Sequence, residues 1–228
     1  CEIMDPNIIL ILCDDLGYGD VSALNPNSKI NTENIDQIAE AGISFNDTHT
    51  SSAVCTPSRY SLLTGRYNFR SALKSGVNFG YSQPLIENNR LTLPQMLKTT
   101  GYYTAMVGKW HLGLDWKTTS GEYISQGGTV DEAGIDPGID FSAPVLGGPT
   151  ENGFDYFFGI PASLDMPPYV YLENNLITSI PTNLNFEGYA SNIDGLSITQ
   201  EDTNNFEGRP GPVDQKMRPD KVLADISK

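Results

Sequence analysis

Two adjacent carboxylates, Asp14 and Asp15, stand between an apolar run at residues 8–13 and a glycine-containing turn at residues 17–20. Like charges this close are costly unless a proton or a cation compensates them, and carboxylate oxygens are ligands that calcium prefers. Adjacent aspartates are also common in turns and helix caps. The pair therefore indicates either a hard-cation site or an ordinary turn. Two histidines in the whole chain nearly exclude a histidine-based zinc site.

The pentapeptide Cys55-Thr-Pro-Ser-Arg59 has the residue types to hold a reactive group. Pro57 fits the first turn of a helix. Cys55 then lies at the amino end, where free N–H groups and the helix dipole favour negative charge. Arg59, four residues further on, is within reach of Cys55 or of what it binds. The alternative is a half-buried structural cysteine beside an arginine with a local partner, and these residues alone leave both interpretations open.

Lys109 and His111 are separated by one residue, so in an extended segment both side chains point the same way. They could therefore act together on a substrate. The alternative is a lysine whose stem covers apolar surface beside a hydrogen-bonded structural histidine. His49 has no such neighbours, and we expect it to be structural.

Alternating strands and helices are expected to position these residues. The predicted strands cover residues 8–13, 43–45 and 103–107, and the predicted helices cover residues 32–41, 57–65 and 92–101. This order indicates an α/β fold with a mainly parallel sheet. Sites in such folds gather at the carboxyl ends of strands, where the pattern places both Asp14-Asp15 and the Lys109/His111 pair.

The pattern weakens after Lys117. Residues 118–150, rich in Gly, Ser, Thr and Pro, are predicted to form a long loop or insertion. Residues 151–171 indicate strand and loop material, and the polar remainder contains one predicted helix that begins near Arg218.

Composition limits the partners. The chain of 228 residues has 14 Lys+Arg and 28 Asp+Glu, a net charge of −14. An acidic chain without a basic cluster is a poor candidate for nucleic acid or anionic membranes, and no apolar run approaches the length of a membrane span. Three cysteines without a CxxC pair argue against a disulfide framework and a thiolate zinc site.

Together the motifs resemble those of the type I sulfatases, which belong to the alkaline-phosphatase-like superfamily. The shared segments, in the family's order and spacing, are Asp14-Asp-Leu-Gly-Tyr-Gly-Asp20, Cys55-Thr-Pro-Ser-Arg59, Leu62-Leu-Thr-Gly-Arg66 and Gly108-Lys-Trp-His-Leu-Gly113. The resemblance is dense over residues 6–115 and looser over 151–175, where residues 163–169 look like members acting on sulfated sugars. It implies a mainly parallel sheet sandwiched by helices.

In that family the cysteine of the pentapeptide is oxidised to formylglycine by a maturation enzyme, and the aldehyde hydrate is the nucleophile. One hydroxyl attacks sulfur and the alcohol leaves; the second hydroxyl then loses its proton, so the aldehyde reforms and sulfate is expelled. The resemblance implies that Cys55 takes this part. Asp14, Asp15 and the modified Cys55 would bind one Ca²⁺. Arg59 would hold the hydrate oxygens, Lys109 would neutralise the sulfate, and His111 would orient or deprotonate the hydrate.

The chain also departs from the family. Members carry a later Asp-Asn/His pair, a further histidine and a further lysine, whereas residues 118–228 contain no histidine and no Asp-Asn-Gly or Asp-His-Gly run. We therefore expect residues 1–228 to be the amino-terminal part of one sulfatase catalytic domain, truncated before its carboxy-terminal part. Its core would be 1–117, its insertion 118–150 and its incomplete continuation 151–228.

The expected activity is hydrolysis of a sulfate ester, on a sulfated carbohydrate or an aryl sulfate. One alternative is a phosphonate or phosphate ester hydrolase of the same superfamily, and another is an inactive fragment without a complete site. Family habit suggests the periplasm or the exterior. Cys1 would fit the first residue of a processed lipoprotein, although a chain cut at an arbitrary point explains it equally well.

Overall fold

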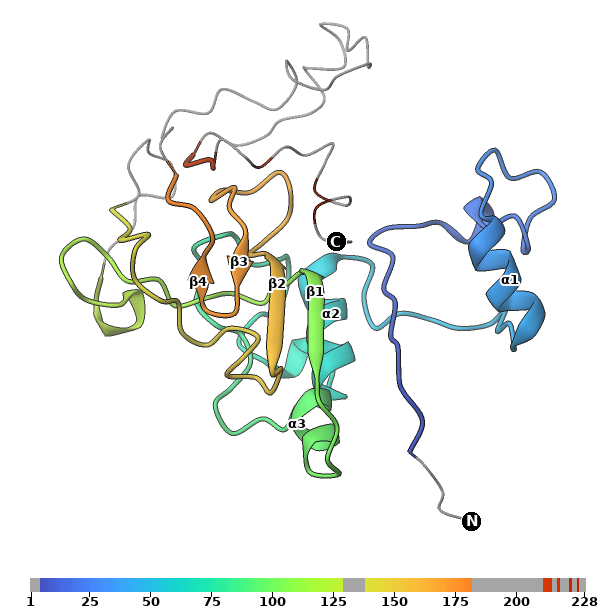
Figure 1. Cartoon of the computed structure of the whole chain (residues 1–228), viewed down its shortest axis with the longest axis horizontal. Coiled ribbons are helices and arrows are strands. Elements are labelled where there is room, and N and C mark those ends of the chain that lie inside the picture. Colours follow the sequence, from blue (N-terminus) through green and yellow to red (C-terminus); the bar gives the residue numbers. More distant parts are fainter. Residues whose placement is uncertain are drawn as a thin grey trace, which may run out of the picture. The chain divides into compact units, whose positions relative to one another are not determined.

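The computed structural model describes residues 5–128, 138–181 and 211–214, together with Met217, Val222 and Asp225. The chain divides into two compact units, Cys1–Thr50 and Ser51–Lys228, and each is described by itself (Figure 1). Cys1 lies outside the described residues, as does Arg218, where a helix is predicted to begin.

The first unit contains the short 3₁₀ helix η1 (Tyr18–Asp20) and the helix α1 (Glu33–Ala41). Thr32 stands at the N-cap of α1 and Gly42 at its C-cap, so the helix predicted over residues 32–41 is confirmed. Asp36 on α1 accepts a hydrogen bond from the Ser22 hydroxyl at 2.6 Å. This bond is the main cause that lowers the pKa of Asp36. The contact ties the loop before α1 to the helix.

The two strands predicted in the first unit are wrong. Residues 8–13 and 43–45 are not in any strand, and the large apolar side chains at 8–12 are 45–84% exposed. A strand exists only where a neighbouring strand supplies hydrogen-bond partners, and the described residues of this unit contain no other strand. The apolar run at residues 8–13 correctly indicated an extended segment, but a local pattern does not indicate whether a neighbouring strand is present.

The second unit is built on a four-stranded sheet in the order β1-β2-β3-β4. Its strands are β1 (Ala105–Lys109), β2 (Tyr156–Ile160), β3 (Leu172–Glu173) and β4 (Leu176–Ile177). The pair β1–β2 is parallel and the other two pairs are antiparallel. The α/β class is confirmed, but the sheet of the described residues is mixed rather than mainly parallel. Only residues 174 and 175 join β3 to β4, which permits antiparallel pairing alone, whereas a longer loop, residues 161–171, returns the chain from β2 to β3 in the antiparallel direction.

β1 lies two residues further along the chain than the predicted strand at 103–107, so Lys109 ends the strand rather than following it. Gly108 on β1 is paired with Gly159 on β2. A Cβ atom added at Gly159 would lie 1.7 Å from the Gly108 carbonyl oxygen. The glycine at 159 therefore allows the two backbones to approach closely at the end of the parallel pair.

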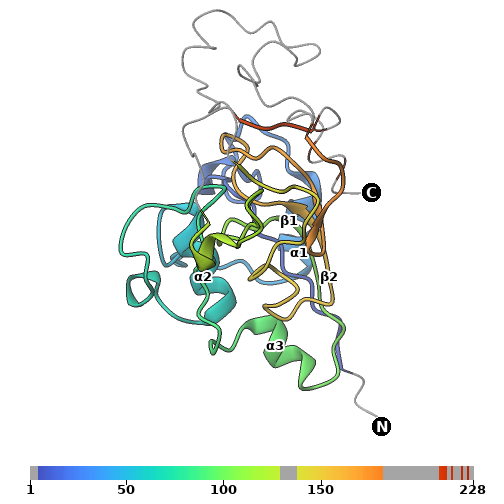
Figure 2. The same cartoon turned by 90° about the vertical axis from the view of Figure 1, so that its left-hand side faces the viewer.

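The helices of this unit are α2 (Cys55–Thr64) and α3 (Leu93–Lys98), with the 3₁₀ turns η2 (Asn68–Arg70) and η3 (Ile124–Gln126). α2 begins two residues before Pro57 and ends at Gly65, which has a left-handed φ of 64°. α3 begins with a capping box between Thr92 and Gln95 but ends earlier than predicted. Both α-helices lie on the same side of the β1–β2 pair (Figure 2), so these two alone do not form the implied sandwich.

The core of the second unit joins α2 to the segment that follows β1. Its buried members include Tyr60 and Leu63 of α2, Phe157 of β2, and alternate residues from Trp110 to Trp116. A separate cluster packs Ile160 against Tyr169, Tyr171 and Val213. Burial of these side chains fixes both the chain beyond β1 and the inner face of α2. No helix in the described part of the chain is long and apolar enough to span a membrane.

Candidate active site

The end of the parallel strand pair places Lys109 beside Ser163. Lys109 is paired with Ile160, and the next two amides continue the contact: Trp110 N–H donates to the Ile160 carbonyl and His111 N–H to the Pro161 carbonyl, each at 3.0 Å. The Lys109 ammonium nitrogen consequently lies 3.3 Å from the Ser163 hydroxyl oxygen. The ammonium therefore reaches the loop that follows β2.

The amino end of α2 is held against the same segment. The Thr56 hydroxyl, fully buried, donates to the His111 carbonyl oxygen at 2.9 Å and accepts from the Asn78 amide at 3.1 Å. Thr56 follows Cys55, whose thiol is half-buried and not in a disulfide. The first turn of α2, with its free N–H groups, is thus fixed beside the chain that carries His111.

Arg59 makes a second link between α2 and β1. Its side chain is nearly buried, and its guanidinium donates a short hydrogen bond to the main-chain carbonyl of Lys109. This contact anchors the guanidinium against the end of β1. The Arg59 guanidinium on α2 is therefore held at the main chain of the residue that ends β1.

His111 is fully buried and has a positive φ of 57°. Its Nε2 lies 2.7 Å from the Asn78 carbonyl oxygen. Because a carbonyl only accepts, Nε2 carries the proton in this contact, and in the neutral ring Nδ1 is then the nitrogen that can take up a proton. The ring orientation is thereby fixed by Asn78, to which Thr56 is also bonded.

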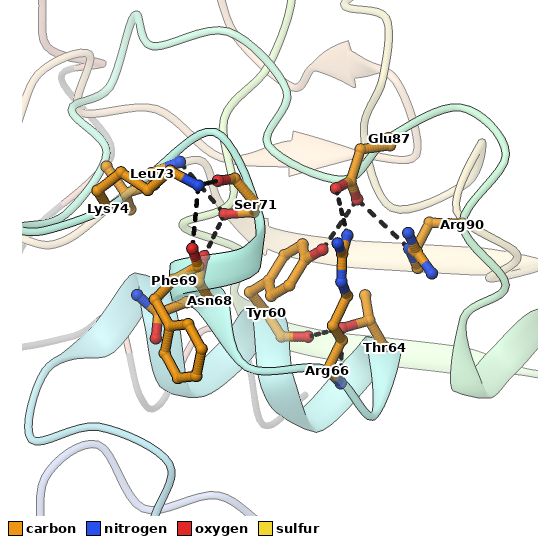
Figure 3. Close-up of polar contacts among 10 residues, drawn as sticks. All are labelled: Tyr60, Thr64, Arg66, Asn68, Phe69, Ser71, Leu73, Lys74, Glu87 and Arg90. Carbon is orange, nitrogen blue, oxygen red and sulfur yellow. Dashed lines mark hydrogen bonds and ion pairs between the residues drawn. The ribbon is translucent and has the colours of Figure 1, made fainter.

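Glu87 supports the other end of α2 (Figure 3). It accepts hydrogen bonds from the Tyr60 hydroxyl at 2.9 Å and from Arg66 at 2.8 Å, and Arg90 lies 3.5 Å away. Burial by itself would raise the pKa of Glu87, but hydrogen bonds and the charges of Arg90 and Arg66 outweigh it and hold the pKa below its usual value. Burial is the main cause that raises the pKa of Tyr60, and the hydrogen bond to Glu87 raises it further.

Asp14 and Asp15 lie in the first unit, at the turn that follows the extended segment, and both are exposed. The described residues contain no group of three or more acidic, histidine or cysteine side chains that could hold a metal ion. Two carboxylates fall short of the six to eight oxygen ligands of calcium. Asp14 and Asp15 belong to the first unit and Cys55 to the second, so the predicted calcium site stays a prediction.

The second unit thus brings Arg59, Lys109, His111 and the amino end of α2 into one network. A cation such as Arg59 on α2, together with the free N–H groups at the start of that helix, suits an anionic group. Three participants were not predicted from the sequence, namely Thr56, Asn78 and Ser163. Thr56 lies within the pentapeptide 55–59 and Ser163 within residues 163–169, so motifs marked both, whereas no local pattern marks Asn78.

Comparison with known proteins matches residues 6–222 to the family described as Sulfatase. The chain is 39% identical over 186 residues to an N-acetylgalactosamine-6-O-sulfatase of Bacteroides thetaiotaomicron, which covers 80% of this chain and 32% of that protein. It is 38% identical over 164 residues to arylsulfatase G of Rattus norvegicus, which covers 71% of this chain and 25% of that protein.

Solved structures give the same picture. A structure from work on glycosaminoglycan metabolism by B. thetaiotaomicron superposes with a TM-score of 0.67 at 30% identity, covering 94% of this chain and 44% of the other. The crystal structure of Ps i-CgsB gives a TM-score of 0.52 at 29% identity, and the superposition covers 70% of this chain and 29% of the other. The chain spans between a quarter and a third of the length of these two curated relatives.

Proposed function

Because this chain belongs to the sulfatase family, we propose that it carries the nucleophile-bearing part of an enzyme that hydrolyses sulfate esters. The observation that supports this most directly is the network around the amino end of α2. There the residue after Cys55 is bonded to the main chain at His111, and Arg59 is bonded to the main chain at Lys109. In this proposal Cys55, Arg59, Lys109 and His111 are the catalytic residues.

Each residue has a task that follows from its position. The Lys109 ammonium, on the last residue of a strand and directed toward Ser163, would neutralise the oxygens of a bound sulfate. The buried Arg59 guanidinium would hold the nucleophile's oxygens in place. His111, with Nε2 donating to Asn78, would orient the nucleophile or accept its proton at Nδ1.

A thiol at position 55 could attack the ester but could not complete the reaction, because its carbon has no hydroxyl whose deprotonation would expel the sulfate. Oxidation of Cys55 to formylglycine by a maturation enzyme would supply an aldehyde hydrate with two hydroxyl groups. The half-buried thiol at the start of α2 is consistent with this role, since the N–H groups there favour the developing negative charge.

Calcium would be held by Asp14, Asp15 and the modified residue 55, and it would polarise the bound sulfate. Two carboxylates and the hydrate of residue 55 are fewer than the six to eight oxygen ligands of calcium, so other oxygen groups or water would complete the shell.

The proposed substrate is a sulfated carbohydrate. One relative is named for N-acetylgalactosamine 6-O-sulfate and another is named an arylsulfatase, so a sulfated amino sugar is the first compound to test. Action on a sulfated carbohydrate suits a periplasmic or extracellular location, which we propose for the intact protein.

The test combines mass spectrometry with turnover. The intact protein is expressed with a formylglycine-generating enzyme, and the peptide spanning residues 51–66 is examined for an aldehyde in place of the thiol. Matched aryl sulfate and aryl phosphate esters are then compared. We expect the aldehyde and a clear preference for sulfate. A preference for phosphate would instead establish the phosphate ester hydrolase, and a thiol with no turnover would establish an inactive chain.

A further inference from the structure

Two aromatic rings are stacked on the surface just beyond α2. Tyr67 and Phe69 have ring centroids 5.2 Å apart and planes inclined by 14°. Each residue is 55% exposed, so neither ring is explained by burial in the core. Exposed aromatic groups that are held together commonly mark a binding surface.

The backbone under these rings is well held. Tyr67 is the N-cap of η2, and the Ser71 amide and hydroxyl both donate to the Asn68 carbonyl, at 2.8 and 2.6 Å. The turn is therefore closed on both sides of Phe69. A ring pair on such a turn is preformed, which reduces the entropy cost of binding a ligand.

Lys74 binds the main chain of the turn that carries Phe69 (Figure 3). Its ammonium donates to the carbonyl oxygens of Phe69 at 3.0 Å and Ser71 at 2.7 Å. An ammonium has three N–H donors, so one remains for an anionic acceptor. No carboxylate of the described residues forms an ion pair with Lys74 or with the neighbouring, exposed Arg70.

The surrounding sequence is locally basic in an acidic protein. Residues 48–86 contain Arg59, Arg66, Arg70 and Lys74 but no Asp or Glu, although the chain as a whole has a net charge of −14. Arg59 is nearly buried and Arg66 is paired with Glu87, so the charge of this surface comes from the exposed Arg70 and Lys74. An anionic ligand is therefore the one that the local charge favours.

We propose that Tyr67, Phe69, Arg70 and Lys74 form a second binding surface, for a sulfated polysaccharide chain. A sugar ring offers an apolar C–H face that can pack on an aromatic ring, and its sulfate group offers an acceptor for a charge-assisted hydrogen bond. Tyr67 and Phe69 supply the aromatic surface, and Arg70 and Lys74 supply the charge on the same turn and its continuation. The proposal rests on the proposed function, since it supplies that activity with a polymeric substrate.

The position of this surface suits a polymer. Cys55 is the first residue of α2, and Tyr67 follows the end of that helix. At about 1.5 Å per residue the ten-residue helix spans roughly 15 Å. The surface therefore does not contact the reacting ester, and only a substrate longer than one sugar can reach both places.

Direct binding tests the proposal without requiring turnover. The intact protein carrying Cys55→Ala is titrated with chondroitin sulfate and with its desulfated form. We expect Tyr67→Ala with Phe69→Ala to weaken binding of the sulfated polymer about tenfold per ring, as for lost burial of an aromatic side chain. Lys74→Gln should weaken binding of the sulfated form alone. Phe69→Tyr should retain the affinity, which separates the ring from general damage.

Tyr103→Ala is the matched control, because Tyr103 is also exposed, at 74%, but has no stacking partner among the described residues. It should leave polymer affinity unchanged. Unchanged affinity in the Tyr67→Ala/Phe69→Ala variant would overturn the proposal. So would self-association, measured by sedimentation, that disappears in this variant, because the surface would then belong to a contact between copies.

Failure of this inference is distinguishable from failure of the proposed function. Turnover of a small aryl sulfate together with polymer binding that does not depend on the rings would overturn only the second surface. Ring-dependent polymer binding without any turnover would support the surface and overturn the proposed activity. In an active protein, the double variant should raise KM for the polymer and leave kcat for the aryl sulfate unchanged.

Discussion

The hydroxyl of Thr56 and the main-chain carbonyl of His111 are hydrogen-bonded at 2.9 Å although 55 residues separate them. The same hydroxyl accepts from the Asn78 amide, and Asn78 in turn accepts from the His111 ring. One buried side chain thus links the start of α2, a loop and the segment after β1. Each of these bonds lies away from water, where an unmade partner is costly.

Replacing Thr56 tests this link. Thr56→Val keeps the shape but removes the hydroxyl, so a buried amide and a buried carbonyl each lose a partner. We expect a loss of about 1–3 kcal/mol in the free energy of unfolding, measured by urea denaturation of the intact protein. Thr56→Ser retains the hydroxyl and should cost less. Equal stability of the two variants would show that the bond contributes nothing.

Lys109 is predicted to contribute to turnover through its charge. Lys109→Ala should lower the turnover of an aryl sulfate by about 10²–10³, the usual effect of removing one group that stabilises a developing anion. Lys109→Arg should restore part of the rate, because the charge is kept. His49→Ala is the control, since that exposed ring contacts only Asp47 among the described residues. An unaltered rate in Lys109→Ala would remove Lys109 from the site.

The lowered pKa of Glu87 predicts that the free energy of unfolding depends on pH. Its pKa is lower in the folded protein than the reference value of 4.5. The stabilisation is therefore complete above that value, where the carboxylate is charged in both states, and is lost as the pH falls through the folded pKa. Wild type and Glu87→Gln should differ in urea midpoint at pH 7 and converge in acid. Because Glu87 is 40% exposed, the difference should be modest.

The control for Glu87 is Glu122→Gln, since Glu122 is exposed and has no ion pair among the described residues. Its midpoint should follow that of the wild type at every pH. A gap between wild type and Glu87→Gln that widened in acid would reverse the expected sign and contradict the assignment.

Gly159 is predicted to tolerate no side chain. A Cβ there would lie 1.7 Å from the Gly108 carbonyl oxygen, which is backbone and cannot rotate away. Gly159→Ala should therefore cost about 1–3 kcal/mol or more, as for an overpacked core, and should lower turnover by displacing Lys109. Gly19→Ala is the matched control, because a Cβ at Gly19 would have room: its nearest atom, the Asn25 side-chain nitrogen, would lie 3.7 Å away. Thermal unfolding of both variants measures the difference.

Local signals in the sequence were sufficient to predict that the three α-helices exist, although not every boundary of α2 and α3. Gly42 and Gly65 end α1 and α2 as predicted, and Thr92 caps α3 with Gln95. These signals act within one or two turns, so a single sequence contains them. The motif around Cys55 likewise indicated the family before any coordinates, since its residue types and spacing are specific.

Strand pairing and the contacts of the candidate site were decided only by the tertiary structure. The sequence placed a strand at residues 8–13, where none forms, and started β1 two residues early. It gave no indication that Asn78 would orient His111, or that Ser163 would meet Lys109. The physical reason is that sheet hydrogen bonds and these side-chain contacts join residues far apart in the chain. Helix and cap signals require only near neighbours.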